Sequence, residues 1–379
     1  MRIFQNFQFD FLSRRKFAYL LSGSLFLIGV TSAIFRGFHF GVDFNGGSEI
    51  VLQFEKPIQI SDVRGYVDDI GLGYLEVKTF GDETGVMIRT EQQVIPPQIY
   101  PRVIAGLESE IEKIIPAVPR QIVDSSMNSI TYSFENPDTT NKIVDALLEA
   151  GFQAGKVSEE PNNNQMRVSI SIADWLKENL RARISNNPFI VLKEDRVGPK
   201  IGEELKRDAV LALFFSLVAI LFYLGFRFKF IFAFGAVAAL FHDVLITLGL
   251  YAALYGLIPG LNLEIDITIV AAFLTLIGYS VNDTVVVFDR IRENLKIHKT
   301  RPLFDIVNSS MSQTMSRTIL TGGATLLTLL VLLVFGGEVL RAFAFTMFFG
   351  IIIGTYSSIY VASSFVYEYA NKFNKKVEF

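Results

Sequence analysis

Six apolar runs constrain what this chain can fold into more than any other feature of its sequence. The first occupies residues 17–35, and five more lie at 209–226, 230–255, 265–288, 319–335 and 342–367. Each run is long enough to cross the hydrocarbon core of a bilayer, about 30 Å thick, as one helix. Half of the 379 residues are hydrophobic, more than a protein surrounded by water can hide. The sequence therefore predicts six transmembrane helices, the last five of them in a bundle at 208–370.

The first run has a second interpretation, because a cleaved signal peptide also places an apolar segment behind cations. Here Arg14, Arg15 and Lys16 precede the run. The run is longer than the apolar region of a signal peptide, and no cleavage site of the small-x-small type follows it. We therefore predict an uncleaved first span behind a leader of residues 1–16.

Cations in the short connections predict how the helices are oriented, since short loops rich in lysine and arginine stay in the cytoplasm. With the N-terminus inside, the inner segments hold Arg2, Arg14, Arg15, Lys16, Arg227, Lys229, Arg290, Arg292, Lys296, Lys299, Arg301, Arg317, Lys372, Lys375 and Lys376. The two short outer loops hold Arg341 alone. The sequence predicts that both termini, including a tail at 371–379, are cytoplasmic and that the segment 36–207 lies outside.

The segment 36–207 shows an internal repeat. Patterns of strand, helix, strand and strand at 49–54, 61–70, 74–80 and 86–90 recur at 129–134, 141–150, 152–157 and 166–172. Helical patterns at 98–115 and 173–184 follow the two repeats. Helices that cover one face of mostly antiparallel sheets are typical of α+β domains. We predict a ferredoxin-like, repeated βαββ domain inserted between the first and second transmembrane helices.

Composition excludes several classes of function. The chain has no cysteine and only three histidines, so thiolate chemistry and a metal centre built on histidines are not expected. A net charge of −3 without a cationic block gives no nucleic-acid surface. We expect no metal, no cofactor, no nucleic-acid partner and no enzymatic activity.

Asp283 is the first candidate for function, because an ionisable residue inside a bilayer is costly. It lies in the fourth run, next to Asn282, and helical spacing places Tyr279 and Ser280 on its face. Arg317 stands before the fifth run, with Thr321 one turn further on. An arginine that moves toward a buried carboxylate stabilises its ionised form, and one that moves away favours proton uptake.

Asp283 and Arg317 therefore predict a proton relay. Each residue also has a simpler interpretation: Asp283 can be a hydrogen-bonding contact between helices, and Arg317 can be a side chain that reaches the lipid headgroups. His242 and Asp243, near the middle of the third run, are open to both interpretations, relay or packing, as are Tyr279, Ser280, Asn282 and Thr321. Asp243 and Asp283 also suit an intramembrane aspartyl protease, but the sequence Ser-Val-Asn-Asp lacks the Gly-x-Gly-Asp pattern of such enzymes.

Small residues predict close contacts between helices. Gly350 and Gly354 stand at GxxxG spacing in the sixth run, and Ser357 and Ser358 follow them. Such spacing lets two helix backbones approach closely in a membrane.

Several motifs in a fixed order resemble the SecF family of bacterial protein export. The segment 41–47 (GVDFNGG) holds Gly41, Asp43, Gly46 and Gly47, and the segment 197–205 (VGPKIGEEL) holds Gly198, Pro199 and Gly202. His242-Asp243, the segment 277–294 (IGYSVNDTVVVFDRIREN) and Ser316-Arg317-Thr318 complete the set. Their positions relative to the six apolar runs make the combination specific.

The resemblance implies a function. SecF-like proteins belong to the resistance-nodulation-division superfamily. With SecD, they use the proton-motive force to help the SecYEG channel move unfolded polypeptides across the bacterial inner membrane. On this resemblance Asp283 matches the relay aspartate, Arg317 matches its basic partner, and the domain 36–207 is periplasmic. A second unit at about 118–172 departs from the family pattern, so no role is implied for it. The nearest alternative is one half of a related proton-driven efflux transporter.

Overall fold

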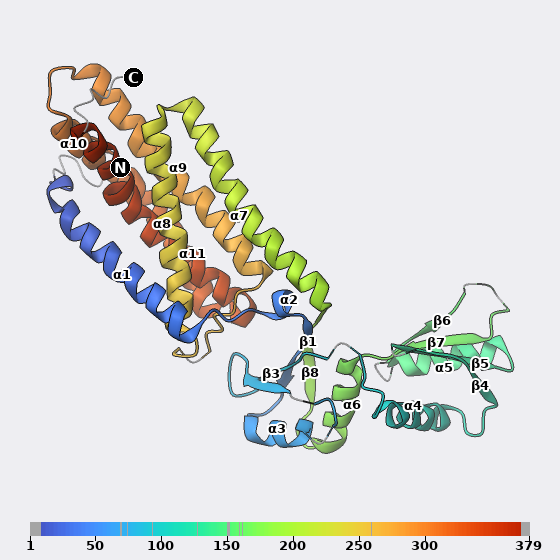
Figure 1. Ribbon diagram of the computed structural model, residues 1–379. Coiled ribbons are helices and arrows are strands. Elements are labelled where there is room, and N and C mark those ends of the chain that lie inside the picture. Colours follow the sequence, from blue (N-terminus) through green and yellow to red (C-terminus); the bar gives the residue numbers. More distant parts are fainter. Residues whose placement is uncertain are drawn as a thin grey trace. The chain divides into compact units, whose positions relative to one another are not determined.

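The computed structural model describes residues 9–372, except 69, 74, 93, 127, 150, 151, 159, 161 and 259. The chain forms two compact units, one of residues Met1–Phe44 with Glu204–Phe379 and the other of Asn45–Glu203 (Figure 1). Several predicted features lie outside the described residues. They are Arg2 in the leader, the ends of two elements at Tyr74 and Ala150, and the tail beyond Lys372.

The first unit is helical, and among the described residues six helices are long and apolar enough to cross a membrane, which confirms the predicted number. They are α1 (Arg15–Arg36) behind the short turn η1 (Leu12–Arg14), α7 (Pro199–Arg227), α8 (Phe230–Leu254), α9 (Ile267–Ile297), α10 (Leu303–Phe335), and a last span in three parts. That last span consists of α11 (Gly337–Ser357), a π-helical turn η2 (Ser358–Ser363) and α12 (Ser364–Lys372). The first helical residue of α7 is Pro199, a position where the missing N–H is not needed.

Two helices are longer than the apolar runs from which they are predicted. Helix α9 extends to Ile297, and α10 begins at Leu303 instead of near residue 319. The extensions are amphipathic, and they pack together through a hydrogen bond of 2.8 Å from Asn294 Nδ2 to Ser310 Oγ. Because a search for uninterrupted apolar runs passes over amphipathic turns, the sequence placed Arg317 at the start of its helix. Arg317 instead lies in the interior of α10.

The unit of residues Asn45–Glu203 holds two four-stranded antiparallel sheets. The first contains β1 (Gly47–Phe54), β2 (Glu76–Thr79), β3 (Gly85–Thr90) and β8 (Phe189–Val197), in the order β2-β3-β1-β8. Helices α3 (Ile60–Asp68) and α6 (Ile172–Arg183) pack together against this sheet. Along the chain, β1-α3-β2-β3-α6-β8 is the βαββαβ order of a ferredoxin-like fold.

The second sheet is built from a segment inserted between β3 and α6. It contains β4 (Arg120–Ser126), β5 (Ser129–Phe134), β6 (Gln153–Lys156) and β7 (Gln165–Ser169), in the order β4-β5-β7-β6. Helices α4 (Tyr100–Ile114) and α5 (Pro137–Glu149) pack against each other beside it. The sheet order is that of the first sheet, but its extra helix and strand, α4 and β4, precede the βαββ unit. The second fold is therefore a circularly permuted copy of the first, and its βαββ core is the predicted repeat.

This topology differs from the predicted assignment of two helices. The sequence places the helix at 98–115 with the first repeat and the helix at 173–184 with the second. In the structure α4 packs on α5 of the second repeat, and α6 packs on α3 of the first. The extra unit predicted at 118–172 thus lacks its first helix. Both helices bury one apolar face in the same continuous core, so their patterns carry no signal for the sheet to which each belongs.

The strands β4 and β8, which the sequence does not predict, are both edge strands with a bulge. The bulges leave Val123 and Leu192 without a partner across the ladder. Both side chains are exposed. A bulge makes an edge strand a poor template for further pairing, and it also interrupts the alternation from which a strand is predicted.

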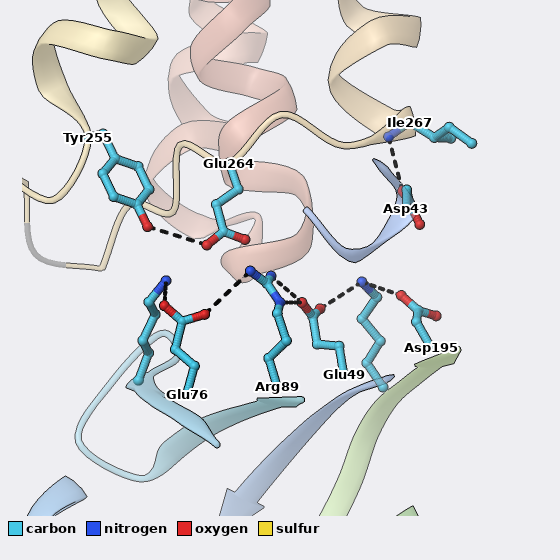
Figure 2. Close-up of polar contacts among 10 residues, drawn as sticks. Asp43, Glu49, Glu76, Arg89, Asp195, Tyr255, Glu264 and Ile267 are labelled. Carbon is cyan, nitrogen blue, oxygen red and sulfur yellow. Dashed lines mark hydrogen bonds and ion pairs between the residues drawn. The ribbon is translucent and has the colours of Figure 1, made fainter. Parts of the chain in front are cut away.

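Alternating charges cross the face of the first sheet that lies opposite its helices. Arg89 binds the carboxylates of Glu49 and Glu76, and Lys193 binds those of Glu49 and Asp195 (Figure 2). Burial by itself lowers the pKa of Lys193. The hydrogen bond to Asp195 and the charge of Glu49 outweigh it and hold this pKa above its ordinary value. The network connects all four strands of this sheet.

Helices α1 and α8 touch through two glycines, and this contact gives a stability prediction. A Cβ atom at Gly29 would lie 2.8 Å from the Cα atom of Gly249. We expect Gly29→Ala to lower the free energy of unfolding by about 1–3 kcal/mol, since overpacking forces the helices apart. Thermal unfolding of the purified chain in detergent measures the change. The matched control is Gly23→Ala on the same helix, which meets no atom within 4 Å. Equal melting temperatures for the two variants would contradict this account.

Candidate functional site

Two hydroxyl groups hold the carboxylate of Asp283 between three helices of the first unit. Thr318 of α10 donates a hydrogen bond of 2.6 Å to Oδ1, and Ser358 of the last span donates one of 2.9 Å to Oδ2. Both donors are buried. A carboxyl group in an apolar bundle needs such partners, because an unsatisfied polar group there costs several kcal/mol.

A cavity of about 120 Å³ opens beside this carboxylate. Its walls come from α9, α10 and the last span, and its lining residues are Tyr279, Asn282, Asp283, Val286, Arg317, Thr318, Thr321, Gly322, Thr325 and Thr355. Water fits a polar space of this size. The cavity therefore gives Asp283 a polar environment within the bundle.

Arg317 lines the same cavity but forms no ion pair with Asp283 among the described residues. Its side chain is exposed. A single cation thus shares a polar space with a carboxylate that is held by two neutral hydroxyls. This arrangement allows the distance between the charges to change without breaking the contacts of Asp283.

The residues predicted to share a face with Asp283 divide between two sites. Tyr279, Asn282 and Thr321 line the cavity, and the Tyr279 hydroxyl donates to Thr325 Oγ1 at 3.3 Å. Ser280 does not face the cavity. It donates a hydrogen bond of 2.6 Å to Oδ2 of Asp243 instead.

Asp243 is the centre of this second site, and its side chain is 1 % exposed. Besides Ser280, it accepts a hydrogen bond of 2.9 Å from Ser357 of the last span. Its other oxygen lies 3.0 Å from Nδ1 of His242. Asp243 thus connects α8 with α9 and with the last span.

Consecutive serines of the last span therefore hold the two aspartates, Ser357 on Asp243 and Ser358 on Asp283. The π-helical turn η2 begins at Ser358, and π-helical turns are frequent at functional sites. A Cβ atom at Gly354 would lie 2.9 Å from Ser280 Oγ, so only glycine lets the last span come this close to α9. The spacing of small residues predicts a helix contact at Ser357 and Ser358, but it does not connect these serines with the acids. The GxxxG spacing was the only signal.

The family motifs near the boundaries between the units have structural roles. Asp43 accepts a hydrogen bond of 3.0 Å from the N–H of Ile267 at the start of α9 (Figure 2). The N–H of Gly41 donates to the carbonyl oxygen of Ile265. In the other unit Gly46 has a φ of 75°, and a Cβ atom there would lie 2.9 Å from Cα of Pro199. The two motifs 41–47 and 197–205 therefore meet at Gly46 and Pro199.

Gly47, Gly198 and Gly202 complete these motifs. Gly47 has a φ of 117°, and a side chain there would collide with the carbonyl oxygen of Thr90. The carbonyl oxygen of Gly198 accepts the N–H of Gly202 at 2.9 Å, in the first turn of α7. These glycines serve backbone geometry and carry no chemistry of their own.

Among the described residues, no group of three His, Cys, Asp or Glu side chains is arranged to hold a metal ion. The paired acids Asp243 and Asp283 are bound to different serines and not to each other. That separation gives no support to an aspartyl-protease pair, whose two carboxyl groups share one proton.

Comparison with known proteins gives two family matches. The profile of the protein export membrane protein SecD/SecF, C-terminal, matches residues 177–372, and the SecD/SecF GG motif matches residues 31–58. The first match contains both aspartates and Arg317, and the second contains the segment 41–47.

Two relatives of similar length are both named protein translocase subunit SecF. The protein translocase subunit SecF of Rhodothermus marinus is 39 % identical over 97 % of this chain and 95 % of its own length. That of Koribacter versatilis is 37 % identical over 97 % of this chain and 93 % of its own length.

A solved structure from the same family also matches this chain. The crystal structure of SecDF from Thermus thermophilus, a translocon-associated membrane protein, matches 97 % of this chain with a TM-score of 0.64 and 28 % identity. This chain spans 39 % of that longer SecDF chain. Together with the six apolar helices, these matches identify a multi-pass membrane protein. The chain belongs to the SecD/SecF family of protein export membrane proteins, in which its full-length relatives are SecF subunits.

Proposed function

We propose that this chain is the SecF subunit of a SecDF complex that uses the proton-motive force to assist export of unfolded polypeptides through the SecYEG channel. The similarity to a longer SecDF chain, of which this chain spans 39 %, supports SecD as the partner that supplies the rest. The cationic inner loops support a place in the bacterial inner membrane with both termini cytoplasmic and the unit Asn45–Glu203 periplasmic. No step of this function makes or breaks a covalent bond, so we propose no enzymatic activity.

The observation that carries the proposal is the carboxylate of Asp283 at the wall of a polar cavity that also contains Arg317. A proton that reaches Asp283 removes its negative charge and with it the attraction for the guanidinium. Arg317 then moves away, and loss of the proton draws it back. This cycle is a proton relay that α9, α10 and the last span carry out together.

The free energy available to one proton is of the size that such a change requires. A unit charge that crosses 100 mV gains about 2.3 kcal/mol. Shifting a conformational equilibrium from 1:99 to 99:1 takes about 5.5 kcal/mol. One proton therefore biases the rearrangement strongly without completing it from that starting point.

A path for this change leads along α9 toward the periplasmic unit. Asp283 lies on α9, and Asp43 is hydrogen-bonded to the first turn of the same helix. Two residues beyond Asp43 the chain enters the other unit, where Gly46 meets Pro199. In the proposal, a shift of α9 reaches the periplasmic unit through the segments 41–47 and 197–205, and that unit contacts the emerging polypeptide.

One half of a related efflux transporter remains the second candidate, because a buried carboxylate and an arginine also suit proton-driven export of small molecules. Cells that lack the protein would then accumulate dyes or drugs while their secretion stays normal. Impaired secretion with unchanged dye efflux supports the first proposal.

Asp283→Asn tests the relay directly. Membrane vesicles that contain the variant with its SecD partner are expected to export a secreted reporter but to lose all stimulation by a proton gradient, since the amide cannot take up and release the proton. The matched control is Asp289→Asn on the same helix, where the carboxylate is 58 % exposed and pairs with Arg227. Gradient stimulation in both variants would exclude Asp283 as the relay.

Arg317 offers a test of the second half of the relay. We expect Arg317→Gln to lose gradient stimulation and Arg317→Lys to keep part of it, since lysine retains the charge but not the planar guanidinium. The same vesicle assay measures both. If Arg317→Gln is stimulated as strongly as wild type, the arginine is only a side chain at the headgroups.

A further inference from the structure

A row of hydrogen bonds leads from α1 through Tyr356 and Ser22 to His242. This Ser22–Tyr356 row determines which ring nitrogens of His242 carry hydrogen. The hydroxyl of Tyr356 donates to the carbonyl oxygen of Ala18 at 2.5 Å. A phenol has one hydrogen, so Tyr356 has none left for another acceptor. Ser22 Oγ lies 2.9 Å from the same phenol oxygen. Because the phenol hydrogen goes to Ala18, we assign the hydrogen of that contact to Ser22.

The next hydrogen bond of the row joins Ser22 to the imidazole of His242, and its direction follows from that of the first. Nε2 of His242 lies 3.0 Å from Ser22 Oγ. Because the hydrogen of Ser22 points to Tyr356, Nε2 must carry a hydrogen and donate it to Ser22. The other ring nitrogen, Nδ1, lies 3.0 Å from Oδ1 of Asp243. A bare Nδ1 against an ionised carboxylate would set two lone pairs against each other.

One more hydrogen must therefore lie between the imidazole and the carboxyl group. The pair is either an imidazolium with a carboxylate or a neutral imidazole with a carboxylic acid. In both forms it holds one proton more than a neutral imidazole beside a carboxylate, and its net charge is zero. The side chains are 15 % and 1 % exposed, and a net-neutral pair is the form that an apolar bundle accommodates at least cost.

Each helix around the pair presents neutral groups. Helix α1 presents Ser22, α9 presents Ser280, and the last span presents Ser357 and the ring of Tyr356, which stacks on His242 with centroids 6.1 Å apart. Among the described residues, no cation and no second carboxyl group is hydrogen-bonded to the pair. Asp283 is connected to it only through the neighbouring serines Ser357 and Ser358.

We propose that His242 and Asp243 form a second proton-binding site in the membrane unit, distinct from the one at Asp283. The bound proton is shared between Nδ1 and Oδ1, and the Ser22–Tyr356 row keeps it there by fixing the hydrogen on Nε2. The site exists whether or not Asp283 works as a relay, because its proton count follows from its own hydrogen bonds. Its connection to Asp283 is the Ser357-Ser358 pair.

Nitrogen NMR of the full chain in lipid nanodiscs tests the proposal, since the chain has only three histidines. With 15N-histidine, His39→Gln and His298→Gln assign the signals of His242. At neutral pH we expect a hydrogen on Nε2 together with either a second hydrogen on Nδ1 or a protonated carboxyl. A protonated carboxyl would show as an infrared C=O band that Asp243→Asn removes. A neutral ring with its hydrogen on Nδ1 would overturn the proposal, and so would a hydrogen on Nε2 alone without such a band.

Tyr356→Phe provides a second, independent test. Without the phenol, Ser22 can donate to Nε2, and the pair can lose its extra proton to become a neutral ring beside a carboxylate. Nitrogen NMR of this variant at neutral pH should then show a neutral ring with its hydrogen on Nδ1 and none on Nε2. The matched control is Tyr360→Phe, because the Tyr360 ring lies tilted against Tyr356 with centroids 5.2 Å apart but its hydroxyl is not part of the row. A hydrogen that stays on Nε2 in Tyr356→Phe would contradict the proposed role of the row.

Discussion

The packing of the membrane unit depends on how it satisfies two buried carboxyl groups. No water surrounds a helix in the bilayer core, so each acid must find its partners on neighbouring helices. Asp243 and Asp283 both find them on the last span, in Ser357 and Ser358. Because these serines are adjacent, any change at one acid that moves the last span is felt at the other. The π-helical turn η2 begins at Ser358, and turns of this kind are frequent at functional sites.

Close backbone contacts make this arrangement possible. Gly29 against Gly249 brings α1 to α8, and this contact keeps Ser22 within reach of His242. Gly354 brings the last span to α9 and thus to Ser280. The polar cavity lies beside Asp283 of α9, where Arg317 and the threonines of α10 line its walls. Packing by small residues and hydrogen bonding by hydroxyls therefore act together to hold charges inside an apolar bundle.

Much of this architecture can be predicted from the sequence, and there are physical reasons why the remainder cannot. Uninterrupted apolar runs predict the six membrane helices, and period-two patterns predict the βαββ cores of both sheets. The edge strands β4 and β8 are hidden because bulges break their alternation. The exchange of α4 and α6 is hidden because both helices bury equivalent faces. Asp283 and Arg317 stand out as ionisable residues near apolar runs, whereas Thr318, Ser357 and Ser358 do not, since a hydroxyl in a membrane helix can also bond to its own backbone.

Hydrogen exchange in the segment Gly354–Ser363 of the full chain in nanodiscs tests most directly the claim that the charge of Asp283 controls the last span. Exchange is measured in acidic and in alkaline buffer, corrected for the intrinsic effect of pH, for wild type and for Asp283→Asn. The account predicts that the opening equilibrium of this segment changes with pH in wild type and changes less in the variant, which keeps only the second site at His242 and Asp243. An equilibrium that is independent of pH in wild type, or that changes equally in both, would contradict it.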